Sequence, residues 1–194
     1  ILMNNQKLKR RIRISLIGRQ LGKITKEIIR KFIYIPKYMS QLTCYETAKI
    51  NNPKIFADTI YNNFLYLKDF PELMHTQKNI IDTLNTNEGM NYLVYFNKKL
   101  IAYLIGDFRT LSDNRYVYYV SYFYVLAAYR NQKLGSQLLQ KLINKCKSKG
   151  VKFIVLTCDA KDDKAMNFYK KYGFVQDPIL GEKNKRHNVY CLYL

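Results

Sequence analysis

The stretch Tyr129–Leu139, YRNQKLGSQLL, places a short polar turn directly in front of an amphipathic helix. The first backbone N–H groups of a helix have no partner within the helix and lie at the positive end of its dipole, so they favour an anion. Arg130 and Lys133 add positive charge, and Gly135 allows a close backbone approach. The stretch predicts a turn that binds a diphosphate, although packing and capping alone also produce such turns.

A second motif, Asp162–Val175, reads DDKAMNFYKKYGFV and follows a buried strand-like run, Val151–Cys158. Its apolar residues recur at helical spacing, Asp162 is suited to cap the helix N-terminus, and Gly173 is suited to end the helix. The segment therefore predicts a short helix between two strands.

Together the two motifs resemble the GNAT superfamily of acetyl-CoA-dependent N-acetyltransferases, over roughly Leu42 to Leu194. In that family a strand ends in a V-x-P-x-[YF]-R-like segment, followed by [RQ]-x-x-G-x-[GA], whose N–H groups bind the diphosphate of coenzyme A. The first pattern falls here on Val125, Ala127, Tyr129 and Arg130. The later family pattern, N-x-x-A-x-x-F-Y-x-x-x-G-F, falls on Asp162, Ala165, Phe168, Tyr169, Gly173 and Phe174.

Two positions depart from the family pattern. Asp162 replaces the usual asparagine, and Lys133 stands where the loop has its first glycine. Lysine tolerates a positive φ poorly, whereas a loop residue in the right-handed region would accept it. The conformation of the loop therefore stays open at this point.

The whole chain predicts one strand, two helices, three antiparallel strands, a helix, a strand, a helix and two strands. Pro53–Leu67 is expected to bury one helical face, and Asn97-Lys98 to turn a hairpin between two strands. The face consists of Ile55, Phe56, Ile60, Phe64 and Leu67. This is an α/β (α+β) fold, and the GNAT family has the same order, with a mixed, mostly antiparallel sheet, helices on both faces and a splayed central strand pair. By resemblance, the gap lies between the strands ending at Ala127 and starting at Val151.

The resemblance implies acetyl-CoA as co-substrate and Tyr169 as the acid that protonates the departing thiolate. A phenol with an ordinary pKa of about 10 is well matched to that task. The cofactor contacts implied for the strand end, the turn and the two helix starts are Tyr124, Val125, Leu126, Ala127, Arg130, Asn131, Gln132, Lys133, Leu134, Gly135, Ser136 and Asp162. No metal site is expected, since the cysteines form no C-x-x-C pair and the two histidines lack ligand spacing.

A general base is harder to assign. Several family members have a glutamate on the strand before the loop, but Tyr116–Leu126 contains no carboxylate. We expect water to remove the amine proton, with activity rising until the amine is neutral. Asp107 is an alternative base, although an exposed aspartate at a strand end is the simpler interpretation, and His75 and His187 are expected to make surface or loop contacts.

The expected reaction is transfer of an acetyl group to a primary amine, of a small molecule or a peptide, by direct attack in a ternary complex. A backbone N–H near Val125 or Leu126 is expected to hold the oxyanion. The acceptor is not specified by the sequence. Candidate acceptor contacts are Tyr119, Ser121 and Tyr122, although strand tyrosines also serve in packing. A net charge of +19 disfavours polycationic acceptors, and transfer of a longer acyl group stays open.

The 194 residues suit one domain, with residues 1–37 as a basic N-terminal extension and 38–194 as the acetyltransferase domain. Residues 1–37 hold eleven Lys or Arg against Glu27 alone, which suits nucleic acid, an anionic membrane or organellar targeting. Abundant Lys, Asn, Tyr and Ile also fit an AT-rich genome, so binding through this segment is not favoured. The four cysteines fit a reducing intracellular compartment better than a disulfide framework. The oligomeric state is not predicted.

The alternative is a module that binds coenzyme A without turnover and acts through its basic segment. Deleting residues 1–37 separates the two, because a transferase is expected to keep its turnover with a soluble amine. A tethered binder would instead lose its affinity for DNA or anionic vesicles, and the salt dependence of that affinity. Turnover and salt-dependent binding of the full and shortened chains are the measurements.

Overall fold

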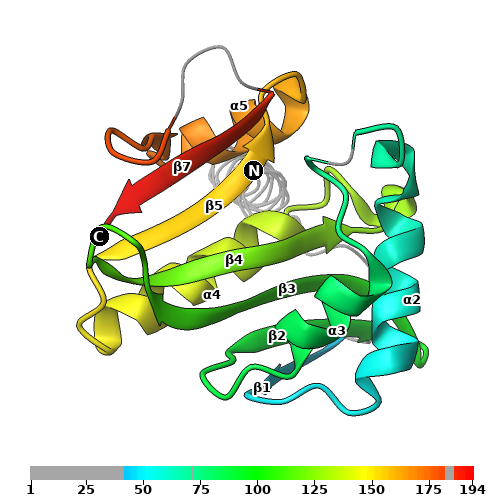
Figure 1. The fold of residues 1–194 in the computed structure, drawn as a ribbon. Coiled ribbons are helices and arrows are strands. Elements are labelled where there is room, and N and C mark those ends of the chain that lie inside the picture. Colours follow the sequence, from blue (N-terminus) through cyan, green and yellow to red (C-terminus); the bar gives the residue numbers. More distant parts are fainter. Residues whose placement is uncertain (1–41, 71, 182–185) are drawn as a thin grey trace, which may run out of the picture. The chain divides into compact units, whose positions relative to one another are not determined.

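The computed structural model describes residues 42–70, 72–181 and 186–194. The basic segment 1–37 and the boundary predicted at residue 38 lie outside the described residues. The elements, in chain order (Figure 1), are β1 Leu42–Thr47, α2 Pro53–Asn63, a 3-10 turn Leu65–Leu67, α3 Gln77–Leu84, β2 Asn91–Phe96, β3 Lys99–Thr110, β4 Tyr116–Val125, a 3-10 turn Ala127–Tyr129, α4 Leu134–Ser148, β5 Phe153–Asp159, α5 Asp163–Lys171, β6 Val175–Gln176 and β7 His187–Tyr193. This is the predicted order of strands and helices.

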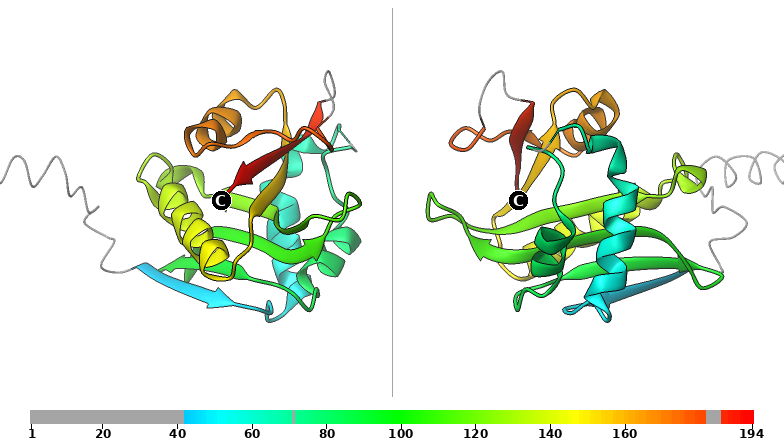
Figure 2. Two further views of the ribbon diagram at one scale, coloured as in Figure 1. Left: turned by 90° about the vertical axis from the view of Figure 1, so that its left-hand side faces the viewer. Right: turned by 45° about the vertical axis from the view of Figure 1, so that its right-hand side comes forward.

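The strands form one seven-stranded sheet in the order β1-β2-β3-β4-β5-β7-β6. Strands β4 and β5 run parallel, and the other described neighbours are antiparallel. Helices α2 and α3 cover one face, and α4 and α5 cover the other (Figure 2). The predicted mixed, mostly antiparallel sheet with helices on both faces is confirmed. No helix in the described part of the chain is long and apolar enough to cross a membrane.

Local sequence signals account for several element ends. Asn97 and Lys98 both adopt positive φ values, 47° and 64°, as the tight hairpin between β2 and β3 requires. Helix α4 ends before Gly150, which has a φ of 70°. Asp162 caps α5, since its Oδ1 accepts a hydrogen bond from the Ala165 N–H at 3.0 Å.

The predicted buried face of α2 is wrong at one residue. Ala57 and Ile60 are fully buried against β3 residues such as Ile105, but Ile55 is 68% exposed. Five residues of helix amount to about 140° of rotation beyond a full turn, so Ile55 and Ile60 lie on different sides. The buried stripe passes through Phe56 instead.

Strands β4 and β5 separate part-way along their length. They pair only between Tyr118–Val120 and Ile154–Leu156, whereas β4 continues to Val125. The register of β4 against β3 shifts so that Val120 faces Gly106 and Tyr122 faces Ile105. Ser121 is therefore the extra residue of a β-bulge, and bulges bend a strand and increase its twist. The predicted splayed central pair is confirmed, and the gap opens directly after the bulge.

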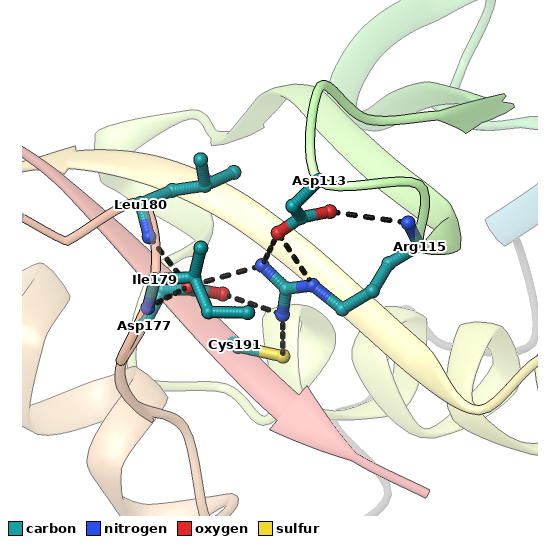
Figure 3. A network of polar contacts seen from close by, with 6 residues as sticks. All are labelled: Asp113, Arg115, Asp177, Ile179, Leu180 and Cys191. Atoms are coloured by element: carbon teal, nitrogen blue, oxygen red, sulfur yellow. Dashed lines mark hydrogen bonds and ion pairs between the residues drawn. The ribbon is translucent and has the colours of Figure 1, made fainter.

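A buried ion network fixes the turn after β6 to the β3–β4 hairpin (Figure 3). The Arg115 guanidinium donates to both carboxylate oxygens of Asp177, at 2.8 and 3.0 Å, and its Nε donates to Asp113 at 2.7 Å. The Asp177 carboxylate is fully buried and also accepts from the backbone N–H groups of Ile179 and Leu180. Three further groups, the Asp113 carboxylate and the backbone N–H groups of Ile179 and Leu180, thus meet the Asp177–Arg115 pair, which ties the turn after β6 to the hairpin.

Replacing Asp177 by asparagine is expected to lower the free energy of unfolding by about 2–3 kcal/mol at pH 7, because the buried Arg115 loses one charged partner. Burial opposes ionisation of Asp177, but the hydrogen bonds from Arg115, Leu180 and Ile179 outweigh it and lower the pKa of this carboxyl. Its stabilising effect is therefore present above the unfolded pKa of about 3.9 and is lost as the pH falls through the lower folded pKa.

Urea denaturation at pH 7 and at about pH 3 checks this prediction. The difference between the original protein and the Asp177→Asn variant should shrink at the lower pH. Asp69→Asn, at an exposed position, is the control that should change little. An equal loss in both variants, or a loss independent of pH, would contradict the assignment.

Candidate active site

A cleft of about 1110 Å³ opens where β4 and β5 part. Its walls come from the second half of β4, the end of β5, the starts of α4 and α5, and the segment from α2 to α3. Tyr119 marks the closed end of the gap, since its hydroxyl and the Thr157 hydroxyl are hydrogen-bonded at 2.6 Å. The cleft thus continues from a strand gap on one side to an aromatic surface on the other.

The edge of β4 that faces the gap carries backbone groups of alternate residues. The Leu126 N–H donates to the Ile101 carbonyl on β3 at 2.8 Å. Backbone groups of successive strand residues point to opposite edges, so those of Val125 and Phe123 point toward the gap. Arg130 Nε donates to the Val125 carbonyl at 2.8 Å, which agrees with this direction. Of the two predicted oxyanion donors, Leu126 is therefore already engaged with β3, and Val125 is the one directed into the gap.

The turn before α4 settles the question about Lys133. This residue has a φ of 64° and a ψ of 2°, so the left-handed conformation that suits the family's glycine is kept. The alternative that Lys133 adopts the right-handed region is wrong. Asn131 is also left-handed, at φ 60°, and the two positive φ values aim the start of α4 at the cleft, which Leu134, Gly135 and Ser136 line.

The start of α4 has the properties of an anion site. Within the described residues, no side chain caps its first N–H groups. A Cβ on Gly135 would lie 3.6 Å from Val125 Cγ2 and from a Phe123 ring carbon, so the glycine leaves room between the helix and β4. With Arg130 and Lys133 in the lining, these residues fit the diphosphate and pantetheine of coenzyme A.

Tyr169 lines the same cleft from α5. Its ring packs against Phe168, Phe174 and Phe123, with centroid distances of 5.4, 5.4 and 6.5 Å. Burial raises the pKa of the Tyr169 phenol far above its ordinary value, and the nearby Cys158 adds to the rise. The hydroxyl therefore stays protonated at neutral pH, as a proton donor must.

Most residues predicted for the site line the cleft. They are Tyr119, Ser121, Tyr122, Tyr124, Val125, Arg130, Asn131, Lys133, Leu134, Gly135, Ser136, Asp162 and Tyr169. Leu126, Ala127 and Gln132 are not in the lining. Lys164 adds a further cation to the lining.

Both histidines of the described residues line the cleft, which the sequence did not predict. His75 Nδ1 is 2.6 Å from the Tyr122 hydroxyl, and His187 also lines the cleft. His75 is an exposed loop residue, as expected, and its ring also contacts Tyr122 in the cleft. No motif surrounds it, and Tyr122 lies 47 residues further along the chain, so only the folded chain reveals the contact.

Asp107 is not the base, and it is not an exposed strand-end residue. It lies inside β3, is 3% exposed and is absent from the lining of the cleft. Arg109 Nε donates to its carboxylate at 2.7 Å, and a second Arg109 nitrogen forms an ion pair with it. The spacing of two residues places both side chains on one face of the strand, so the D-x-R pattern was the signal for this pair.

Solved structures with this fold have acetyltransferase names. Arabidopsis thaliana Naa50 in complex with the bisubstrate analogue CoA-Ac-MVNAL is 19% identical, with a TM-score of 0.57 over 78% of this chain and 98% of that one. The ribosomal-protein-S18-alanine N-acetyltransferase from Escherichia coli is 19% identical, with a TM-score of 0.56 over 78% and 94%. An acetyltransferase from Streptococcus agalactiae is 18% identical, with a TM-score of 0.60 over 79% and 99%. No curated protein matches the chain.

The chain shares the fold of these acetyltransferases. The sequence profile of the acetyltransferase (GNAT) family matches residues 57–174, more than half of the chain, and the protein belongs to that family. It is therefore an acyltransferase that uses acetyl-CoA.

Replacing Lys133 by glycine is expected to raise the free energy of unfolding by about 0.5–1 kcal/mol, since a side chain in the left-handed region costs about 1–2 kcal/mol and glycine's chain entropy offsets part of the gain. Lys98→Gly is the matched control, because Lys98 has the same φ of 64° in a hairpin away from the cleft. Both variants should be stabilised in urea denaturation, but only Lys133→Gly should change affinity for acetyl-CoA. Equal affinities would show that Lys133 makes no contact with the cofactor.

Proposed function

We propose that the protein transfers an acetyl group from acetyl-CoA to a primary amine by direct attack in a ternary complex. The observation that supports this most strongly is the convergence, in one cleft, of an unpaired strand edge, an uncapped helix start and the half-buried Tyr169. We also propose residues 38–194 as the catalytic unit, with residues 1–37 as a basic extension.

Acetyl-CoA supplies an acetyl group activated as a thioester. The N–H groups at the start of α4, with Arg130 and Lys133, are suited to hold its diphosphate. The backbone groups of Val125 and Phe123 that face the gap are suited to pair with the pantetheine arm and to polarise the thioester carbonyl. These groups are fixed by the fold before the cofactor binds, so little reorganisation is needed.

Tyr169 is the proposed acid. Its O–H bond breaks as the proton moves to the departing sulfur, and the proton that the new amide nitrogen sheds restores the phenol. Because burial raises its pKa, the hydroxyl is protonated at neutral pH, but the close match to a thiolate expected of an ordinary phenol is not kept. The nearby Phe123, Phe168 and Phe174 rings keep it in place.

The acceptor amine is proposed to approach from the α2–α3 side of the sheet. Tyr119, Ser121 and Tyr122 lie on that wall of the cleft. Phe64 extends the aromatic surface, with ring centroids 6.2 Å from Tyr122 and 5.8 Å from Tyr124. The cleft therefore offers an apolar surface with hydroxyl groups, which suits an amine on an uncharged or partly apolar molecule.

Tyr169→Phe is expected to lower kcat by about 100-fold, since general acid catalysis contributes about 10²–10⁴, while affinity for acetyl-CoA stays within about twofold. Tyr172→Phe is the matched control, because Tyr172 lies on the next turn of chain, contacts Phe168 and is not in the lining of the cleft. Turnover with an amine panel measures kcat. Calorimetric titration with acetyl-CoA, desulfo-CoA and ATP at fixed salt measures affinity.

Selective, salt-resistant binding of acetyl-CoA over ATP supports the cofactor site. Weak binding that does not distinguish ATP and disappears with salt would contradict the proposed function, since a protein with a charge of +19 attracts any polyanion. Equal turnover in the Tyr169 and Tyr172 variants would show that Tyr169 is not the acid, and would leave the proposed cofactor site unaffected.

A further inference from the structure

The hydrogen bond between His75 and Tyr122 has no role in the function proposed so far. His75 Nδ1 lies 2.6 Å from the Tyr122 hydroxyl, and the two rings meet edge to face at a centroid distance of 5.6 Å. Thr76, the next residue, caps α3 and forms a capping box with Asn79. The backbone that carries His75 is thus held by a helix start, and its ring is held by Tyr122.

Tyr122 lies where the acetyl group and the amine are proposed to meet. It follows the bulge at Ser121 and precedes Phe123, whose backbone faces the gap. Its side chain points to the α2–α3 face, is 6% exposed and packs against Phe64. The Tyr122 hydroxyl therefore links the wall of the cleft to His75, which is itself exposed to solvent.

We propose that His75, acting through the Tyr122 hydroxyl, is the proton acceptor for the acceptor amine. This inference rests on the proposed acetyl transfer. An N–H bond of the bound ammonium breaks as its proton joins the Tyr122 oxygen, while the Tyr122 O–H bond breaks as that proton joins His75 Nδ1. The amine becomes neutral and nucleophilic, Tyr122 is unchanged, and His75 becomes an imidazolium that returns the proton to solvent.

The charged groups around the cleft decide whether His75 is neutral before the reaction. Partial burial, together with the nearby His187 on β7, lowers the pKa of His75 below its ordinary value of 6.5. Glu72 lines the cleft from the same loop, and Asp159 lines it from β5 but is ion-paired with Arg186 at 3.0 Å. On β4, Tyr122 is the direct partner and Tyr119 is bonded to Thr157. His75 is therefore neutral at pH 7 and able to accept a proton.

A histidine base favours an amine of low basicity. An α-amino group has a pKa of about 7.7–8.0, whereas a lysine side chain has a pKa of about 10.4. The pKa gap that a proton must cross to reach His75 is therefore smaller by about 2.5 pKa units for an α-amine than for a lysine amine. The substrate class that follows is an α-amine, such as the N-terminus of a peptide, rather than an alkyl amine.

The experiment compares His75→Asn with the original protein. Asparagine keeps a polar group near the position of Nδ1 and so keeps the contact with Tyr122, but it does not accept a proton at neutral pH. Two probes are used: a seven-residue peptide with a free N-terminus and no lysine, and the same peptide with a blocked N-terminus and one lysine. Tyr172→Phe, at a residue outside the lining of the cleft, is the control.

The original protein should acetylate the free N-terminus at least tenfold faster than lysine, with kcat level above about pH 7. In His75→Asn, kcat at pH 7 should fall about 30- to 100-fold with KM within threefold, and kcat should rise with pH until the amine itself is neutral. Tyr122→Phe should show the same profile, and Tyr172→Phe should retain turnover. Nitrogen NMR of the protein's two histidines should show His75 neutral at pH 7.

A pH profile and a kcat that are unchanged in His75→Asn would overturn the base role, because a purely structural contact is kept by asparagine. Faster transfer to lysine, or no transfer to either peptide while acetyl-CoA still binds selectively, would overturn the α-amine class. In these cases the cofactor site still stands. Loss of selective acetyl-CoA binding in the original protein would instead overturn the proposed function itself.

Discussion

The structure depends on the point at which β4 and β5 stop pairing. Tyr118–Val120 lies against Ile154–Leu156, and directly afterwards the bulge at Ser121 turns β4 away. An unpaired strand edge is normally a liability, since its N–H and C=O groups remain available to any partner. Here the edge faces a cleft rather than solvent or another sheet. The same backbone groups that the sheet gives up are those proposed to receive the pantetheine arm.

The two sides of this gap are held by different means. The β4 side belongs to the large core cluster, where Leu138, Leu139 and Leu142 of α4 are almost fully buried. On the β5 side, β7 and the short β6 complete the sheet, and the network of Arg115 and Asp177 connects them to the β3–β4 hairpin. Apolar packing and a buried ion pair together keep the strands apart at one end while they stay paired at the other.

The features that the sequence predicted correctly are local ones. Asn97 and Lys98 adopt the positive φ values of a tight turn, and Asp162 accepts a hydrogen bond from the N–H group three residues later. Each of these roles involves only nearby residues, so the local sequence is enough to identify it. Ile55 shows the limit of this approach, because hydrophobic periodicity finds an apolar stripe but does not decide which of two overlapping stripes meets the sheet. The position of Lys133 in the family pattern identified the loop, but the residue type left the backbone conformation open.

The acceptor side was least predictable, for a physical reason. The cofactor is held largely by backbone groups whose placement follows from a strand, a turn and a helix in sequence order. The acceptor wall instead joins β4, α2, the loop before α3 and the start of β7, which meet only after the sheet has formed. His75 and Tyr122 therefore share no sequence signal, while Asp107 and Arg109 did share one in their spacing.

Gly106, on β3 beside the bulge, limits which residues the chain can have at that position. A Cβ at this position would lie 2.2 Å from the Tyr119 carbonyl oxygen and 2.6 Å from the Tyr118 hydroxyl, so any side chain would push β3 and β4 apart beside the bulge. The close approach of β3 to β4 beside the bulge thus depends on a residue that does not line the cleft. Whatever the acceptor, position 106 is therefore closed to every residue but glycine.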